Sequence, residues 1–331
     1  MSDAQPHADG KWVDGLSAET PVGKAARVSL AARFGAVCAA LKPAADWGPD
    51  PEPVHDLRVA SRRATAVLDA FADLLPRRVC KKARKALKRL RRAAGAARDA
   101  DVFLDGIRGW SVHQSPADRP GLHFLLGHAF ARRQVAQAGL AAAVDKARPD
   151  LAEELDGLER KLRDGKKGLL GERAAAALPE AVHELAEAVA GDLYDYEQLH
   201  RVRILAKRLR YALELFIDCY PPAVRERVYP RVEAVQDVLG LANDSYQAAK
   251  ALDALLDAVR RTQPGLWDLV RGGIEELRSH HHQRLRDQRA AFTDWWRQWQ
   301  ALRPEALFAA VVTRANSAPS VAAGTRSPAM P

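Results

Sequence analysis

The chain contains two copies of one sequence unit. Residues 55–99 align with residues 200–244 without a gap, at an offset of 145, and eleven of the 45 aligned positions are identical. Chance overlap would match a few alanines and arginines, but not His, Phe, Pro and Gly in register. Because the offset is far longer than the roughly 20–50 residues of a solenoid repeat, we expect two pseudo-symmetric halves. The matched pairs include His55 and His200, Arg58 and Arg203, Arg63 and Arg208, Phe71 and Phe216, and Asp99 and Asp244.

The first segment of each unit has the pattern of an amphipathic helix. In residues 55–75 apolar side chains recur every three or four residues, and a histidine with spaced basic residues lies on the opposite side of the helix. Residues 200–211 repeat this polar stripe. Proline cannot continue a helical hydrogen-bond ladder, so we expect Pro76 and Pro221 to end these helices.

The composition favours an all-α fold. Hydrophobic residues make up 47% of the chain but aromatic residues only 6%, so the core must consist mainly of Ala, Leu and Val. Ala, Leu, Arg and Glu lose little conformational freedom in a helix, and few β-branched runs compete with them. We expect two helical halves, residues 21–165 and 166–305, between flexible tails at residues 1–20 and 306–331.

The second segment of the first unit is strongly basic. Residues 77–98 contain eleven Arg and Lys and no acid, whereas the whole chain has a net charge of +9, so the remaining residues are slightly acidic. On a helical wheel the cations fall on one face and Val, Ala and Leu on the other, which predicts an amphipathic helix over 77–94. Its counterpart in the second unit interleaves Glu226, Glu233 and Asp237. The halves are therefore expected to share an architecture and to differ in charge.

The rest of the chain is expected to supply scaffold, with a seam between the halves near residues 165–178. Gly95 and Gly240 are expected to break a helix, because glycine is common just past helix ends. Side chains that accept hydrogen bonds at a helix start would then cap the next one. The candidate caps are Asp99, Asp101, Asn243 and Asp244. The further predicted helices are 24–41, 121–147, 150–164, 179–197, 246–261 and 266–301.

Several classes of protein are disfavoured. Cys38, Cys80 and Cys219 form neither an even disulfide set nor a CxxC pair, which fits a reducing cytoplasm. No stretch is expected to approach the roughly 20 apolar residues of a membrane span. The N-terminal residues lack a basic region followed by an apolar one, so export is not expected.

Three segments resemble the CHAD family, the conserved histidine α-helical domain. They are VHDLRVASRR (54–63), LHRVRILAKRLRYALELF (199–216) and VLGLANDSYQAAKAL (238–252). The string His-x-x-Arg-x-x-x-Lys/Arg-Arg-x-Arg-Tyr is complete in the second half, and its first nine positions recur in the first. The resemblance covers residues 20–305 and implies an all-α fold of two four-helix-bundle-like halves around a basic cavity. The implied ligand is inorganic polyphosphate, often on intracellular polyphosphate granules.

The resemblance also implies binding positions on both repeats. They are His55, Arg58, Arg62, Arg63, His200, Arg203, Lys207, Arg208 and Arg210. The first half has Thr65 and Ala66 where the second has Arg210 and Tyr211, so we expect the first half to use its following basic helix as well. The candidates there are Lys81, Lys82, Lys85, Lys88, Arg89 and Arg92.

The charge chemistry agrees with a phosphate polymer. Such a polymer offers negative charge and oxygen acceptors without base edges, which dense Arg and Lys match. Residues 77–98 contain no Phe, Tyr or Trp, whereas binders of single-stranded nucleic acid stack bases on aromatic side chains. Nonspecific nucleic-acid binding remains the alternative, because phosphate contacts alone support it on duplex DNA.

Catalysis is the weaker hypothesis. The sequence contains neither GxSxG nor a GxxxxGK[ST] phosphate loop. His280, His281 and His282 point in different directions on a helix and have no ligand four residues on, so no metal site is expected. A phosphohydrolase that holds Mg²⁺ on Asp99 and Asp244 is the third hypothesis. We expect no catalytic residue, no cofactor and a cytoplasmic protein on polyphosphate granules.

Overall fold

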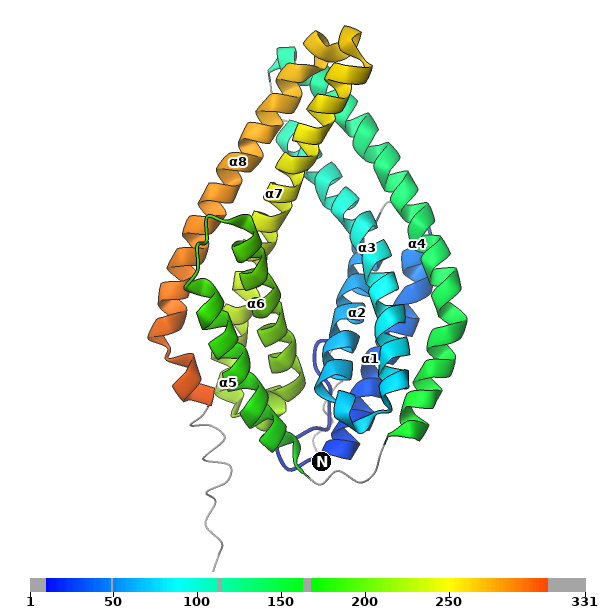
Figure 1. Ribbon diagram of the computed structural model, residues 1–331, viewed down its shortest axis with the longest axis vertical. Helices are drawn as coiled ribbons and strands as arrows, with labels where there is room; N and C mark the ends of the chain where they lie inside the picture. Colours follow the sequence, from blue (N-terminus) through cyan, green and yellow to red (C-terminus); the bar gives the residue numbers. More distant parts are fainter. Residues whose placement is uncertain (1–9, 49, 112–114, 163–167, 309–331) are drawn as a thin grey trace, which may run out of the picture.

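Two sets of four long helices, one from each half of the sequence, build the fold (Figure 1). The computed structural model describes residues 10–48, 50–111, 115–162 and 168–308. These residues form no β-strand, and an isolated bridge pairs Pro21 with Leu169, so the predicted all-α fold is confirmed. The first set is α1 (Val22–Ala45), α2 (Glu52–Ala70), α3 (Arg77–Ser111) and α4 (Arg119–Lys161). The second set is α5 (Leu170–Val189), α6 (Tyr196–Phe216), α7 (Tyr229–Thr262) and α8 (Pro264–Ala301).

The sequence repeat corresponds to α2–α3 in the first half and α6–α7 in the second. In each copy a short 3-10 segment, Ala72–Leu74 or Ile217–Cys219, lies between the first helix and the repeated proline. The first repeat helix therefore ends at Ala70 or Phe216, five or six residues before the proline that was expected to end it. In the second copy a π-helical turn, Val224–Val228, leads into α7.

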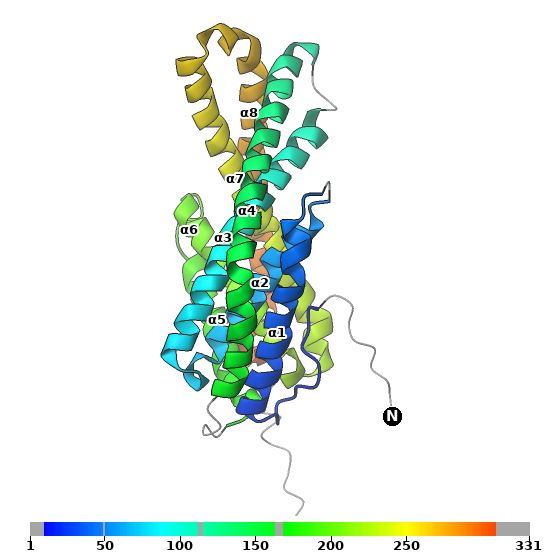
Figure 2. The same cartoon turned by 90° about the vertical axis from the view of Figure 1, so that its right-hand side faces the viewer.

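The two halves face each other across the centre of the molecule. Contacts join α2 to α6 and α3 to α7, and a larger contact joins α4 to α8. In Figure 1 the far ends of α3, α4, α7 and α8 converge at the top. The perpendicular view shows these ends projecting beyond the other four helices (Figure 2). The repeat helices α2 and α6 thus lie at the centre, where the halves meet.

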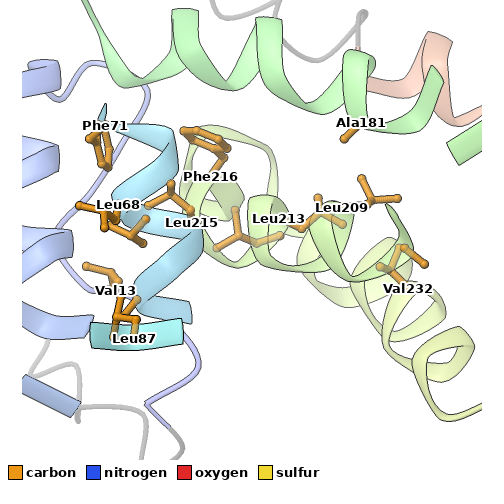
Figure 3. Close-up of a cluster of buried hydrophobic side chains, with 14 of the residues drawn as sticks. Val13, Leu68, Phe71, Leu87, Ala181, Leu209, Leu213, Leu215, Phe216 and Val232 are labelled. Atoms are coloured by element: carbon orange, nitrogen blue, oxygen red, sulfur yellow. The ribbon is translucent and has the colours of Figure 1, made fainter. Parts of the chain in front are cut away.

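One continuous hydrophobic core contains side chains from all eight helices. Leu68 on α2 and Phe71 directly after it belong to this core, as do their repeat equivalents Leu213 and Phe216 on α6 (Figure 3). All four side chains are at most 2% exposed. The repeat therefore preserves core positions as well as the polar stripe.

A second, smaller core holds the far ends of the two halves together. Leu125 on α4 and Ile274 on α8 are buried in it. The backbones of α4 and α8 touch at Gly121 and Gly273, since a Cβ on Gly121 would lie 2.5 Å from the Val270 carbonyl oxygen. Any larger side chain at this crossing would push the two helices apart.

The predicted helix breaks at Gly95 and Gly240 are wrong. Helices α3 and α7 run through both glycines. A glycine inside a helix costs only about 1 kcal/mol relative to alanine, which the packing of these long helices outweighs. The candidate caps Asp99, Asp101, Asn243 and Asp244 consequently lie within helices and cap nothing.

Two other helix boundaries differ from the prediction. The helices predicted at 121–147 and 150–164 form the single helix α4, with Pro149 inside it. Helix α5 begins at Leu170 rather than at residue 179, because Pro179 lies within the helix and not in its first turn. Proline was a misleading boundary signal in both places.

The chain ends pack more closely than predicted. Val13 and Leu16 are buried, and Arg33 donates hydrogen bonds to the carbonyl oxygens of residues 10 and 11. Phe308 is fully buried. These apolar side chains complete the core, although the composition around them favoured a tail. The tail prediction is therefore wrong for residues 10–20 and 306–308, while residues 1–9 and 309–331 lie outside the described residues.

Helix α1 has the length and composition of a membrane-spanning helix. The expectation that no stretch approaches a span is wrong by this criterion. The large apolar residues Leu30, Phe34 and Val37 of α1 are fully buried in the core, and α1 packs on α2 and α4. Packing in the core thus accounts for its apolar composition.

Candidate functional site

A cavity of about 810 Å³ lies between α2 and α6, with α3 and α5 at its edges. Its wall contains basic side chains from all four helices. The acidic residues in the wall are Asp69 and Glu180. The basic residues are Arg58, Arg62, Arg91, Arg173, His200, Arg203, Lys207 and Arg208.

The repeat explains why these cations meet. Arg58 and Arg203 are equivalent positions, and so are Arg62 and Lys207. On each helix they lie opposite the buried apolar face, which packs within its own half. Because α2 and α6 contact each other, the two polar stripes are brought to opposite walls of one cavity.

Four of these cations have no ion-pair partner among the described residues. They are Arg62, Arg91, Arg203 and Lys207. The others are at least partly neutralised. Arg58 lies 3.3 Å from Asp99, and Arg173 lies 2.7 Å from Asp73. Arg208 pairs with Glu184. The middle of the cavity therefore holds a concentrated, unbalanced positive charge.

The crowding of cations shows in their pKa values. Burial lowers the pKa of Lys207, and the nearby Arg203, Arg62 and Arg58 lower it further, to about 6. Burial likewise lowers the pKa of Arg58, Arg91 and Arg203. Both causes penalise the charged form, and the attraction of a bound anion would offset this penalty. The cavity is electrostatically suited to a ligand with several negative charges.

The two repeat histidines have different surroundings. His200 lines the cavity, and its Nδ1 lies 3.5 Å from the Tyr196 hydroxyl. Tyr196 stacks on Tyr246 with ring centres 3.4 Å apart. His55 is half-buried outside the cavity wall, where burial and then the charge of Arg98 lower its pKa. Of the two, His200 is placed to meet a ligand.

Arg63 and Arg210 lie outside the cavity in a buried network around Glu214. Arg63 donates a 2.7 Å hydrogen bond to Glu214, Arg210 donates one of 3.0 Å, and the Tyr229 hydroxyl donates a third of 2.7 Å. Burial alone would raise the pKa of Glu214, but the hydrogen bonds and charges of these partners lower it. Because Arg63 is on α2 and Glu214 on α6, the network ties the two halves together.

The basic helix mostly faces solvent. Lys81, Lys82, Lys85, Lys88 and Arg92 are exposed on α3, and none of them lines the cavity. Arg89 is half-buried and is also absent from the wall. The structure thus brings together six of the fifteen candidates. These six are Arg58, Arg62, His200, Arg203, Lys207 and Arg208.

Sequence reasoning did not select Arg91, Arg173 or Tyr211, which all line the cavity. Arg91 is at the edge of the basic face of α3, beside the apolar face. That edge position is a usable signal, because such a residue lies closest to the neighbouring helix. Tyr211 is part of the repeat string. Arg173 lies outside the repeat, and no sequence pattern marks it.

A smaller pocket of about 360 Å³ adjoins the cavity between α3 and α7. The repeat equivalents Asp99 and Asp244 both line it, next to the cavity arginines. Burial lowers the pKa of Arg203, and the charge of Asp244 partly opposes this effect. Among the described residues no cluster of three or more His, Cys, Asp or Glu could hold a metal ion. The acidic pair thus borders the cationic cavity.

The all-α architecture agrees with the family comparison. The CHAD domain model matches residues 28–253, and the chain belongs to this family. Family members are associated with polyphosphate binding. A comparison with curated protein sequences finds no match.

Two solved structures share the fold. One is the crystal structure of the CHAD domain from the plant Ricinus communis, with a TM-score of 0.68 and 22% identity, covering 89% of this chain and 96% of that one. The other is PptA from Streptomyces chartreusis, with a TM-score of 0.65 and 19% identity, covering 84% of this chain and 100% of that one. At these identities the likeness concerns the fold.

Proposed function

We propose that this protein binds inorganic polyphosphate, without chemical turnover, in the cavity between α2 and α6. The observation that carries the proposal is the set of four cavity cations without a carboxylate partner, contributed by both repeats. The charges of Arg62, Arg91 and Arg203 are half-buried and repel one another, and an extended anion with a charge on every unit would satisfy them and restore the charge of Lys207.

The cavity side chains would make different contacts with the phosphate groups. Arg62, Arg91 and Arg203 offer planar guanidinium groups that hold phosphate oxygens in pairs. Lys207 offers a single charge that is restored when an anion binds, because the anion raises its lowered pKa. His200 is placed to donate a hydrogen bond at the same wall.

The two alternative functions have less support. A nucleic-acid ligand would use exposed aromatic rings, but the aromatic residues at the cavity are Tyr211 and Phe216, and Phe216 is 2% exposed. A phosphohydrolase would need Asp99 available to hold Mg²⁺, yet its carboxylate faces Arg58 at 3.3 Å. A cytoplasmic location on polyphosphate granules is part of the proposal, and a fluorescent fusion in phosphate-fed cells tests it.

The binding proposal is tested by calorimetric titration of long-chain polyphosphate into the Arg62→Gln/Lys207→Gln variant. We expect an affinity at least about tenfold weaker than that of the wild type, since two charge-assisted contacts are lost. The matched control is Arg261→Gln/Arg271→Gln, which removes two exposed charges near the far ends of α7 and α8. Circular dichroism verifies the fold of each variant.

Three outcomes would contradict the proposal. The wild type could fail to bind polyphosphate, the cavity variant could bind as tightly as the wild type, or the control could lose as much affinity as the cavity variant. In a competition assay, polyphosphate should displace duplex DNA at equal phosphate concentration, and DNA should not displace polyphosphate.

A further inference from the structure

We infer that the exposed basic stripe of α3 is a second anion-binding surface, which holds the part of a long polyphosphate chain that extends beyond the cavity. The stripe consists of Lys81, Lys85, Lys88 and Arg92 and is called the α3 stripe below. The inference rests on the proposed function and specifies its substrate class. Long chains reach both surfaces, whereas short chains occupy the cavity alone.

The spacing of the α3 stripe gives it a linear form. Its residues are separated by four, three and four positions, so their side chains lie on one face of the helix. From Lys81 to Arg92 the helix rises about 16 Å. All four side chains are exposed, and none forms an ion pair with a described carboxylate. The stripe therefore presents a row of charges to solvent.

The α3 stripe begins where the wall of the cavity ends. Arg91, which lines the cavity, directly precedes Arg92 and is three residues after Lys88. About two turns before Arg91, Arg84 donates a 2.6 Å hydrogen bond to Asp69, another residue of the cavity wall. Arg84 is itself next to Lys85 in the sequence. A chain that leaves the cavity past Arg91 would meet the stripe within one helical turn.

The fold itself does not require these cations. The repeat equivalents of the α3 stripe on the second half are Glu226, Pro230, Glu233 and Asp237, so the same positions tolerate acids and a proline. Like charges three and four residues apart also destabilise a helix. The stripe therefore opposes helix stability, and a bound polyanion would remove this repulsion.

Two adjoining surfaces make binding depend on chain length. Once one end of a chain occupies the cavity, the stripe binds the remainder at a high effective concentration. A short chain that fits within the cavity gains nothing from the stripe. Long chains should also show a steeper loss of affinity with salt, because more cations release counterions.

The test compares tripolyphosphate with long-chain polyphosphate of about 100 units, a length that makes bivalent contact with cavity and stripe feasible. The stripe variant is Lys85→Gln/Lys88→Gln/Arg92→Gln. The control variant, Arg119→Gln/Arg261→Gln/Arg271→Gln, removes the same charge from exposed positions at the far ends of the helices. Affinity is measured by calorimetry at several salt concentrations.

We expect the stripe variant to bind long chains about tenfold or more weakly than the wild type, with tripolyphosphate affinity within about twofold. The slope of log affinity against log salt for long chains should fall by about 2, which is the single-strand value of about 0.7 for each of three lost contacts. The control variant should keep both the affinity and the slope.

Other outcomes separate this inference from the proposed function. Unchanged long-chain affinity in the stripe variant overturns the inference and leaves the cavity proposal standing. Equal losses in the stripe and control variants also overturn it, because net charge alone would then explain the effect. A wild type that binds neither ligand overturns the proposed function itself.

Discussion

The two repeats use equivalent positions in different ways. In the first half, Asp69 is exposed and pairs with Arg84, whereas its equivalent Glu214 is buried at the centre of the network that joins the halves. Lys88 faces solvent, whereas its equivalent Glu233 pairs with Lys11 and Arg210. The second copy uses its charges for internal connections and the first leaves many of them exposed. At these two positions the second copy contributes to stability, whereas the first copy leaves a charged side chain at the surface.

Among pairs of equivalent positions, we expect Glu214 and Asp69 to differ most in their contribution to the free energy of unfolding. Replacing Glu214 by Gln leaves Arg63 in a buried site without a carboxylate and leaves Arg210 with Glu233 alone, which should lower the free energy of unfolding by about 3–5 kcal/mol. Replacing Asp69 by Asn breaks only an exposed pair, with an expected loss below about 1 kcal/mol. Urea unfolding measures both values. Similar losses at the two positions would contradict the division of roles between the halves.

Lys207 and its equivalent Arg62 should differ in how their charge depends on pH. The pKa of Lys207 is lowered to about 6, so near pH 7 the free protein lacks a proton there that the polyphosphate complex would hold. Affinity should therefore fall by up to about tenfold for each pH unit above 6, which corresponds to about 1.4 kcal/mol per unit. Arginine stays charged throughout this range, so Lys207→Arg should remove the pH dependence.

Calorimetry in two buffers with different ionisation enthalpies counts the protons taken up on binding. The stability of the free protein depends on pH in the opposite direction from its affinity for polyphosphate. An unfolded chain holds the Lys207 proton up to a higher pH than the folded chain, so this group makes the protein more stable as pH rises from about 6 toward the usual lysine pKa. Wild-type binding without proton uptake would rule out a titrating Lys207.

Much of the fold could be predicted from the sequence, because the repeat and the prolines after α2 and α6 carry direct physical information. The site could be predicted only in part. Arg58, Arg62, Arg203 and Lys207 were accessible because they repeat on a polar stripe. The wheel of α3 separates polar from apolar faces, but it does not show which polar residues turn toward α2 and which toward solvent. That choice depends on how α3 packs, and it distinguishes Arg91 from the α3 stripe.

Replacing the repeated glycine by alanine should change the stability of the protein by the same amount in both halves. Gly95 and Gly240 both lie within helices, and a Cβ added at either position meets no atom within 4 Å. Replacement by Ala should raise the free energy of unfolding by roughly 0.5–1 kcal/mol in each case, since alanine loses less backbone entropy. Gly273→Ala is the contrasting control, because its Cβ would meet the backbone at Asp118 and should destabilise the protein. A loss of stability at Gly95 or Gly240 would reveal a constraint that the contacts do not contain.

The smallest stability changes are expected at the equivalent positions Lys88 and Glu233, where removing the charge should have opposite effects. Lys88→Gln removes the repulsion between Lys88 and the basic residues three and four positions away on α3, and should stabilise the free protein by about 0.5 kcal/mol. Glu233→Gln removes the partner of Lys11 and Arg210 at 2.9 Å each and should destabilise it by about 0.5–1 kcal/mol. Denaturant midpoints at low salt resolve both shifts, and added salt should reduce both because it screens exposed charges. With polyphosphate added, the wild type should become more stable than the Lys88→Gln variant, because the complete α3 stripe binds the ligand more tightly. The difference between the wild type and Glu233→Gln should keep its sign.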